Sequence, residues 1–171
     1  DRFVRTWFEV GRNDIGFDKT RQEAKESGAR WFPYSNGGEA RKWYANYLHL
    51  VDWQNDGHVL QTEKHESGRI RAHNFNLDRI FEPGLTWSLI NVAYNAIRVL
   101  PPGFLFSSGA PSLFCNDDLD SALVLGLYNS CVAQYLLNAI NPTVNNNSGD
   151  ADKLPLCLSD SAGETVRKLV G

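Results

Sequence analysis

The sequence predicts an α/β (α+β) fold, in which a twisted sheet with mixed or antiparallel strands carries peripheral helices. Short apolar runs separated by Pro, Gly and Ser clusters recur over residues 85–115, which is typical of strands joined by turns. Residues 119–140 repeat apolar side chains at four-residue spacing, which is typical of one long helix. The chain has 171 residues, of which 42% are hydrophobic, so it suits a single domain with a packed core.

The N-terminal third mixes aromatic runs with turns. Residues 3–10 nearly alternate, which favours a strand or an irregular packed segment. Residues 18–27 are polar and charged and precede Gly28, so they predict a short exposed helix with a glycine stop. Residues 31–47 carry aromatics on both sides of an Asn-Gly-Gly turn, which indicates a loop fixed to a core at each end.

The rest of the chain is predicted from its apolar runs. Residues 48–53 form a strand that 55–57 ends, and the polar residues 58–82 form a helix or a long loop. The helix at 119–140 is followed by a stop at Asn141-Pro142. Further strands are expected at 85–90, 96–100, 104–106 and 112–115, and a terminal helix at 162–170.

Composition narrows the class of protein. The net charge of -3 argues against a protein that coats nucleic acid non-specifically, although a basic face can still bind DNA. Three cysteines, an odd number without a CxxC pair, favour a reduced, cytoplasmic protein without structural zinc. Neither a signal peptide nor a membrane span is expected. The lack of any methionine favours a piece of a longer protein.

Three groups of segments stand out: 31–46 with 51–57; 84–88 with Arg98, 101–106 and Phe114; and 125–130 with 141–143 and 149–155. Together they resemble the C-terminal target-recognition region of BREX-type adenine-specific DNA methyltransferases and of related type IIG restriction-modification enzymes. The third group is also similar to type I specificity subunits and TaqI-like methyltransferases.

This resemblance implies a double-stranded DNA-binding module of a restriction-modification or phage-defence enzyme. Its implied partner is an N-terminal methyltransferase domain of the same chain, which uses S-adenosylmethionine. That domain carries an Asn-Pro-Pro-Tyr/Phe signature and a Gly-rich loop, and neither occurs here, since Asn141-Pro142-Thr143 lacks the second proline and Gly37-Gly38 is no cofactor fingerprint. The chain by itself is therefore expected to be non-catalytic.

Residues that could contact DNA are of the types that read base edges or bind phosphates. Arg41 and Lys42 follow the flexible Gly37-Gly38 turn, although such a segment can also be only a solvated turn. Trp87 could stack on a base, or lie in the core at the start of a strand. The full set of candidate contact residues is Asn36, Arg41, Lys42, Tyr44, Asn46, Arg69, Arg71, Trp87 and Ser88.

Two further features each allow two interpretations. Arg98, between apolar runs, points to solvent or pairs with an acid. The Asn145-Asn146-Asn147 run could read adenine, or be a simple turn.

Two other functional classes remain open from the sequence. Asp14 or Asp18 followed by Glu23-Ala24-Lys25 imitates the spacing of metal-dependent nucleases, although such triplets are common on solvated helices. Alternatively, the chain is a docking or spacer domain that binds other subunits of a defence complex. An Arg/Lys-rich face would favour DNA recognition, whereas a large exposed apolar patch would favour docking.

Overall fold

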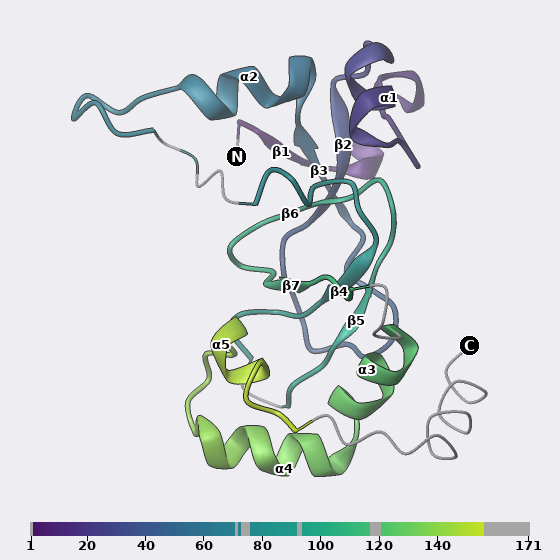
Figure 1. The fold of residues 1–171 in the computed structure, drawn as a ribbon. Coiled ribbons are helices and arrows are strands. Elements are labelled where there is room, and N and C mark those ends of the chain that lie inside the picture. The colour runs from purple at the N-terminus through teal and green to yellow at the C-terminus, as the bar shows by residue number, and fades with distance from the viewer. Residues whose placement is uncertain (1, 71, 73–75, 92–93, 117–120, 156–171) are drawn as a thin grey trace. The chain divides into compact units, whose positions relative to one another are not determined.

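The computed structural model of the chain describes residues 2–70, 72, 76–91, 94–116 and 121–155 (Figure 1). The chain divides into two units, each built from three separate stretches of sequence. Unit 1 comprises Asp1–Asn36, Asn46–Pro83 and Pro101–Ser108, and unit 2 comprises Gly37–Ala45, Gly84–Leu100 and Gly109–Gly171. Because neither unit is continuous in sequence, no linker marks a boundary, and the sequence alone predicts one domain.

Unit 1 is built on a four-stranded sheet with the order β1-β3-β2-β6. Strands β1 (Val4–Thr6), β3 (His49–Asp52) and β2 (Trp31–Ser35) pair antiparallel, and β6 (Leu105–Phe106) joins β2 in parallel. A short 3-10 turn, η1 (Trp7–Glu9), follows β1, and a second, η2 (Arg12–Asp14), follows it. The core of the unit contains Ala24, Phe32, Val51, Trp53, Ile80, Phe81 and Leu105.

Strand β2 corrects one expectation, because residues 31–35 form a strand and not part of a loop. The strand was not predicted because Pro33 lies in its middle among several aromatic residues, and proline is depleted in sheets. Pro33 pairs with Leu50 of β3, whereas β6 joins β2 only from Tyr34 onward. The proline therefore lies at a position of β2 that does not pair with β6.

The charged segment before β2 forms the predicted short helix, α1 (Arg21–Glu26). The Thr20 backbone N–H and hydroxyl both donate to the Glu23 carboxylate, at 2.8 and 2.9 Å, and the Glu23 N–H donates back to Thr20 Oγ1. This reciprocal cap satisfies backbone groups that a helix start leaves open. Gly28 follows at φ 68°, so the predicted glycine stop is confirmed.

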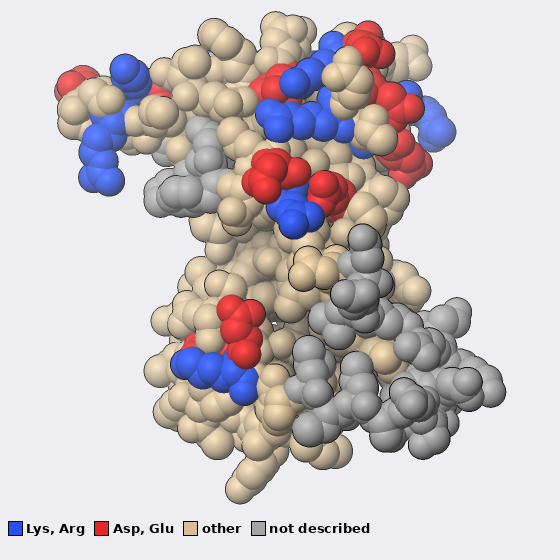
Figure 2. Space-filling view, in the orientation of Figure 1, with Lys and Arg blue, Asp and Glu red and all other residues tan. Residues whose placement is uncertain are grey.

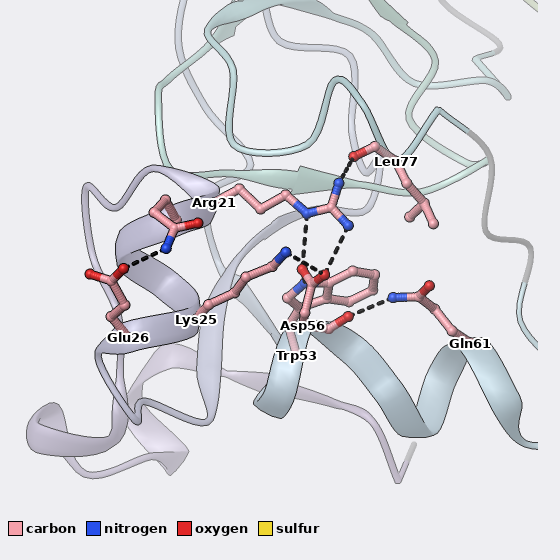
Figure 3. A network of polar contacts seen from close by, with 8 residues as sticks. Arg21, Lys25, Glu26, Trp53, Asp56, Gln61 and Leu77 are labelled. Atoms are coloured by element: carbon pink, nitrogen blue, oxygen red, sulfur yellow. Dashed lines mark hydrogen bonds and ion pairs between the residues drawn. The ribbon is translucent and has the colours of Figure 1, made fainter.

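Helix α2 (Gln54–Thr62) begins with a left-handed turn before it becomes right-handed. Asn55, Asp56 and Gly57 have φ values of 54°, 57° and 69°. At Gly57 a Cβ atom would lie 2.6 Å from the Trp53 ring, so glycine is required both by the backbone angle and by the close indole. The turn directs the Asp56 carboxylate toward Arg21 and Lys25 of α1, as Figure 3 shows.

Unit 2 is built on a three-stranded antiparallel sheet with the order β5-β4-β7. The strands are β4 (Gly84–Thr86), β5 (Arg98–Leu100) and β7 (Ser112–Leu113), so the strands predicted in this part of the chain are present, together with β6 of unit 1. In the described part of unit 2, three helices accompany the sheet: α3 (Ser121–Tyr128), α4 (Cys131–Ile140) and the short α5 (Ser148–Ala151), which lies beside α4 in Figure 1. The unit's core contains Leu85, Trp87, Ile97, Val124, Leu125, Tyr128, Ala133, Leu137, Ala151 and Leu154.

The predicted long helix at 119–140 is instead two helices, α3 and α4, bent by 71° at Asn129-Ser130. Ser130 caps α4, since its Oγ accepts from the Ala133 N–H at 3.1 Å. The break also ends the predicted apolar stripe, because Val132 and Tyr135 are 60% and 75% exposed. The α/β class is thus confirmed, while its single long helix is not.

Within the described residues, no single helix has the length and apolar character needed to cross a membrane. Helices α3 and α4 pass that test only as a bent pair. The terminal helix expected at 162–170 lies outside the described residues.

Candidate nucleic-acid interface

In unit 2, the segment that carries Arg41 and Lys42 is fixed to the edge of the sheet. The Trp43 N–H donates to Ile97 O at 3.1 Å, and the Val99 N–H donates to Trp43 O at 2.8 Å. Trp43 thereby continues the sheet beside Arg98 of β5 as a parallel bridge. The backbone that presents the two cations is therefore held by the sheet and is not a free loop.

Lys42 is positioned by two contacts of its ammonium group within unit 2. Its ammonium donates to Asn129 O at 2.7 Å and lies 5.4 Å from the centre of the Tyr94 ring. The Tyr94 hydroxyl donates to Ala40 O at 3.2 Å, which ties the aromatic ring to the same segment. An ammonium has three donors, so Lys42 keeps hydrogen-bonding capacity for a phosphate.

Arg41 and Tyr44 lie at the surface of unit 2. Arg41 forms an ion pair with Glu39 at 3.1 Å, and the two side chains are 59% and 81% exposed. Exposed pairs of this kind contribute little stability, so a phosphate could replace Glu39 at small cost. Tyr44 is 66% exposed, which leaves its ring available for contact.

Other predicted contact residues belong to unit 1 and differ in their exposure. Asn36 is exposed and Asn46, at φ 64°, is half-buried. Arg69 is exposed on a small hairpin after α2, in which Lys64 bridges Ile70 and the His65 N–H donates to Arg69 O. This hairpin projects beyond the rest of unit 1 (Figure 1). Arg71 lies outside the described residues.

Trp87 and Ser88 are buried, so their side chains offer no contact surface to DNA in this structure. Trp87 is 5% exposed, and its indole N–H donates to Asn146 O at 2.8 Å. Ser88 is 4% exposed, and its Oγ accepts a long hydrogen bond of 3.5 Å from Arg98. The placement of Trp87 in the core, one of the two positions that its sequence context allowed, is the observed one.

Arg98 corrects another expectation, because its side chain does not reach solvent. The residue is 0% exposed, and its guanidinium also donates to Gly37 O at 3.4 Å. Its contacts hold the glycine turn against the sheet of unit 2. The role that the structure shows for Arg98 is therefore to position a loop.

Asn129 is a positioning residue that the sequence did not single out. It is 6% exposed, and its side-chain amide forms two hydrogen bonds with the backbone of Ile97, at 3.1 and 2.8 Å. Its own carbonyl receives the Lys42 ammonium. The helix break thus anchors both β5 and the cationic segment. The sequence signal for it was the Asn-Ser pair inside an apolar helical run, because serine is a common N-cap.

Figure 2 shows that, on the face it presents, blue and red side chains lie next to one another in both units. Ion pairs between such neighbours occur in each unit, for example Arg79 with Glu82 at 3.1 Å in unit 1 and Lys153 with Asp150 at 3.0 Å in unit 2. Among the described residues drawn on this face, the basic side chains therefore form no unbroken surface. DNA recognition by such a chain would depend on a few placed cations, not on a wide positive field.

The nuclease-like triplet has structural roles in unit 1. Glu23 caps α1, and its hydrogen bonds with Thr20 hold the pKa of its carboxyl below the ordinary value. Lys25 forms an ion pair with Asp56 at 3.1 Å. Within the described part of the chain, no group of three or more His, Cys, Asp or Glu side chains could hold a metal ion. These contacts give no support to a nuclease.

The chain thus has an α/β fold in which Arg41 and Lys42 are held at the edge of a sheet. Its sequence is related to adenine-specific methyltransferases. It is 36% identical over 160 residues to the adenine-specific methyltransferase PglX of Lacticaseibacillus casei (strain Zhang), which covers 93% of the chain. It is 33% identical over 172 residues to the adenine-specific methyltransferase BrxX of Escherichia coli O9:H4 (strain HS), which covers 99% of the chain. The resemblance to BREX-type methyltransferases is thus confirmed.

The chain spans about 13% of the length of either relative. No family model matches the sequence. The matched region is therefore a small part of each relative, and the activity of the full-length relatives is not assigned to this chain.

Proposed function

We propose that the chain is a sequence-specific double-stranded DNA recognition segment of an adenine-specific methyltransferase of a phage-defence system. The observation that carries this proposal is the sheet-anchored segment of unit 2, in which Lys42 is held by Asn129 and Tyr94 beside the exposed Arg41 and Tyr44. Fixed cations with a neighbouring aromatic ring suit phosphate contacts that set the position of a base-reading surface. The relationship to the adenine-specific methyltransferases PglX and BrxX supports DNA as the polymer that this segment would bind.

The same proposal assigns the chemistry to another part of the longer protein. S-adenosylmethionine would be bound there, and the Gly37-Gly38 turn of this chain offers it no room. A Cβ atom at Gly37 would lie 2.7 Å from Gly109 O, so the chain's own backbone already occupies the space beside this turn. By itself the chain would bind DNA without methylating it.

The decisive experiment measures binding of the chain to random-sequence duplexes across a salt series, followed by selection and sequencing of the bound pool. Binding that weakens with salt and enriches a motif supports the proposal. The variant Arg41→Gln/Lys42→Gln should bind more weakly and with a shallower salt dependence. A matched control, Arg2→Gln/Lys153→Gln, removes the same two charges from exposed sites elsewhere. Equal losses in both variants would contradict the assignment to this segment.

Docking to another protein is the second candidate, and one observation in unit 1 favours it. Trp7 and Phe8 are 52% and 65% exposed and pack edge to face at 5.7 Å between ring centres. Exposed aromatic pairs are enriched in protein interfaces. A chain that shows no DNA binding at low salt, alone or within the full-length methyltransferase, would favour docking, and Trp7→Ser/Phe8→Ser should then weaken the association of unit 1 with its partner.

A further inference from the structure

Unit 2 contains a hollow of about 290 Å³, and its lining includes Asn146, one of the three consecutive asparagines that could read adenine. Its walls come from the segment before β5, from α4 and from the segment that follows α4. These segments are joined, because the Asn91 N–H donates to Val144 O at 2.9 Å and the Asn146 N–H donates to Leu89 O at 2.7 Å. The polar side chains that matter most in its lining are Asn91, Tyr94, Asn95, Gln134, Asn138 and Asn146.

Side-chain carboxamides dominate this hollow, and no Lys, Arg, Asp or Glu lines it among the residues that the structure describes. Gln134 and Asn138 lie one turn apart on α4, where the Gln134 amide donates to Asn138 Oδ1 at 3.3 Å. Gln134 Oε1 accepts from the Asn95 backbone N–H at 2.8 Å. The lining therefore suits a neutral group that carries both hydrogen-bond donors and acceptors.

Two of these residues, Asn95 and Asn146, have a backbone fixed by hydrogen bonds, while their side-chain amides remain available. The Asn146 backbone is fixed on both sides, since its N–H donates to Leu89 and its carbonyl accepts from Trp87. The Asn95 backbone is fixed by Gln134. In the part of the chain that the structure describes, neither side-chain amide has a hydrogen-bond partner. A fixed backbone reduces the entropy that binding would cost.

The edge of the hollow lies next to the cationic segment. Tyr94 lines the hollow, and the Lys42 ammonium lies 5.4 Å from the centre of its ring. A neutral amide surface with a cation at its edge is the arrangement that a nucleotide requires, with the base on one side and the phosphate on the other. Among the bases, adenine offers an acceptor and a donor side by side, so one carboxamide can donate to the acceptor while another accepts from the donor.

We propose that this hollow reads the major-groove edge of an adenine through the side-chain amides of Asn95 and Asn146, while Lys42 binds a neighbouring phosphate. The inference rests on the proposed DNA-recognition function and adds the residues and the base that it uses.

The test begins with the motif that the wild-type chain enriches from random duplexes. Asn95→Ala and Asn146→Ala should each reduce binding to that motif roughly ten- to hundred-fold, while binding to unrelated duplexes stays within about two-fold. Asn145→Ala is the matched control, because this exposed asparagine is a neighbour in sequence and does not line the hollow. Thermal midpoints within a few degrees of wild type would show that the variants fold.

Two further measurements identify the base. A duplex whose motif adenine is replaced by an analogue lacking the N7 acceptor should bind the wild type weakly and should bind Asn95→Ala/Asn146→Ala no worse than the natural duplex does. Asn146→Asp, which replaces a donor by a second acceptor, should shift the enriched base from adenine toward cytosine.

The possible outcomes separate the two proposals. If the chain enriches a motif that the Asn95 and Asn146 variants retain in full, the hollow does not read DNA, although the proposed function stands. If those variants lose their preference for a guanine or a thymine of the motif and keep the preference for adenine, the assignment to adenine is wrong. If the wild-type chain binds no duplex at any salt concentration, alone or within the full-length methyltransferase, both proposals are overturned.

Discussion

Asp56 accepts two parallel hydrogen bonds from the Arg21 guanidinium, each 2.9 Å long, one to each carboxylate oxygen (Figure 3). Lys25 adds an ion pair at 3.1 Å, and the Trp53 indole N–H donates at 3.3 Å. The remaining Arg21 nitrogen donates to Leu77 O at 2.6 Å. These contacts join α1, the start of α2 and the segment near Leu77, which makes Asp56 the polar centre of unit 1.

Replacing Asp56 should therefore destabilise unit 1 more than the loss of an ordinary surface pair would. Asp56→Asn keeps the size of the side chain but leaves Arg21 and Lys25 without their carboxylate. We expect a loss of roughly 2 kcal/mol in the free energy of unfolding, as for hydrogen bonds to charged groups. Urea denaturation measures it. The control Glu82→Gln breaks the exposed pair with Arg79 and should cost under about 0.5 kcal/mol.

The same group predicts a dependence of stability on pH. Burial by itself would raise the pKa of Asp56, but hydrogen bonds from Arg21 and Lys25 outweigh it and hold the pKa below the ordinary 3.8. A carboxyl with a lowered folded-state pKa stabilises the fold above its unfolded-state pKa. This contribution should thus be complete near neutral pH and should be lost as the pH falls below about 4. Denaturation of the wild type and Asp56→Asn at several pH values should show their difference shrinking only in that acidic range.

Gly57 offers a test that separates backbone strain from steric clash. Gly57→Ala would place a methyl group 2.6 Å from the Trp53 ring at φ 69°, whereas Gly28→Ala has a similar φ of 68° and open space around it. Gly28→Ala should cost about 1 kcal/mol from strain alone. Gly57→Ala should cost at least about 2 kcal/mol, because the indole must also shift. Equal losses in thermal unfolding would show that the ring gives way freely.

The sequence predicted the elements whose signals are local. The polar, charged residues 18–27 with Gly28 after them marked α1, and the Pro- and Gly-rich turns marked β4, β5, β6 and β7. It failed where partners distant in sequence decide the structure. The apolar run at 119–140 repeats like one helix, yet Asn129 forms its hydrogen bonds with Ile97, 32 residues away, and the helix breaks there.

In the candidate site, too, the sequence indicated residues with a local signal and missed those whose position depends on distant partners. Exposed cations such as Arg41 could be proposed from residue type and a glycine turn, because that signal is local. The burial of Trp87 and Arg98 depends on the packing of unit 2, and no short pattern reveals it. The amide hollow joins Asn95 to Gln134 across 39 residues, so only the folded chain brings its lining together.

Asn129 connects the stability of unit 2 to the position of Lys42. Asn129→Ala removes two hydrogen bonds to the buried Ile97 just before β5. It leaves the Ile97 N–H without its acceptor, whereas Ile97 O keeps the Trp43 N–H, so we expect a loss of roughly 1–3 kcal/mol. Asn129→Asp keeps the acceptor for the Ile97 N–H and should cost less only if its carboxyl is protonated or relocates toward Lys42. Thermal unfolding of both variants measures the difference. Stabilities equal to wild type would show that α3, α4 and β5 hold together without this residue.

The two cations of the proposed interface should differ in how they affect DNA binding. Lys42 is held in place by Asn129 and Tyr94, whereas Arg41 must first leave Glu39. Removing one cation that binds a phosphate should reduce the slope of log affinity against log salt by about 1. We therefore expect Lys42→Gln to reduce the slope and to weaken binding more than Arg41→Gln does. Glu39→Gln frees Arg41 and should strengthen binding slightly at low salt. If Lys42→Gln leaves the slope unchanged while Arg41→Gln reduces it, the held ammonium is a structural group, and the phosphate is bound by Arg41 alone.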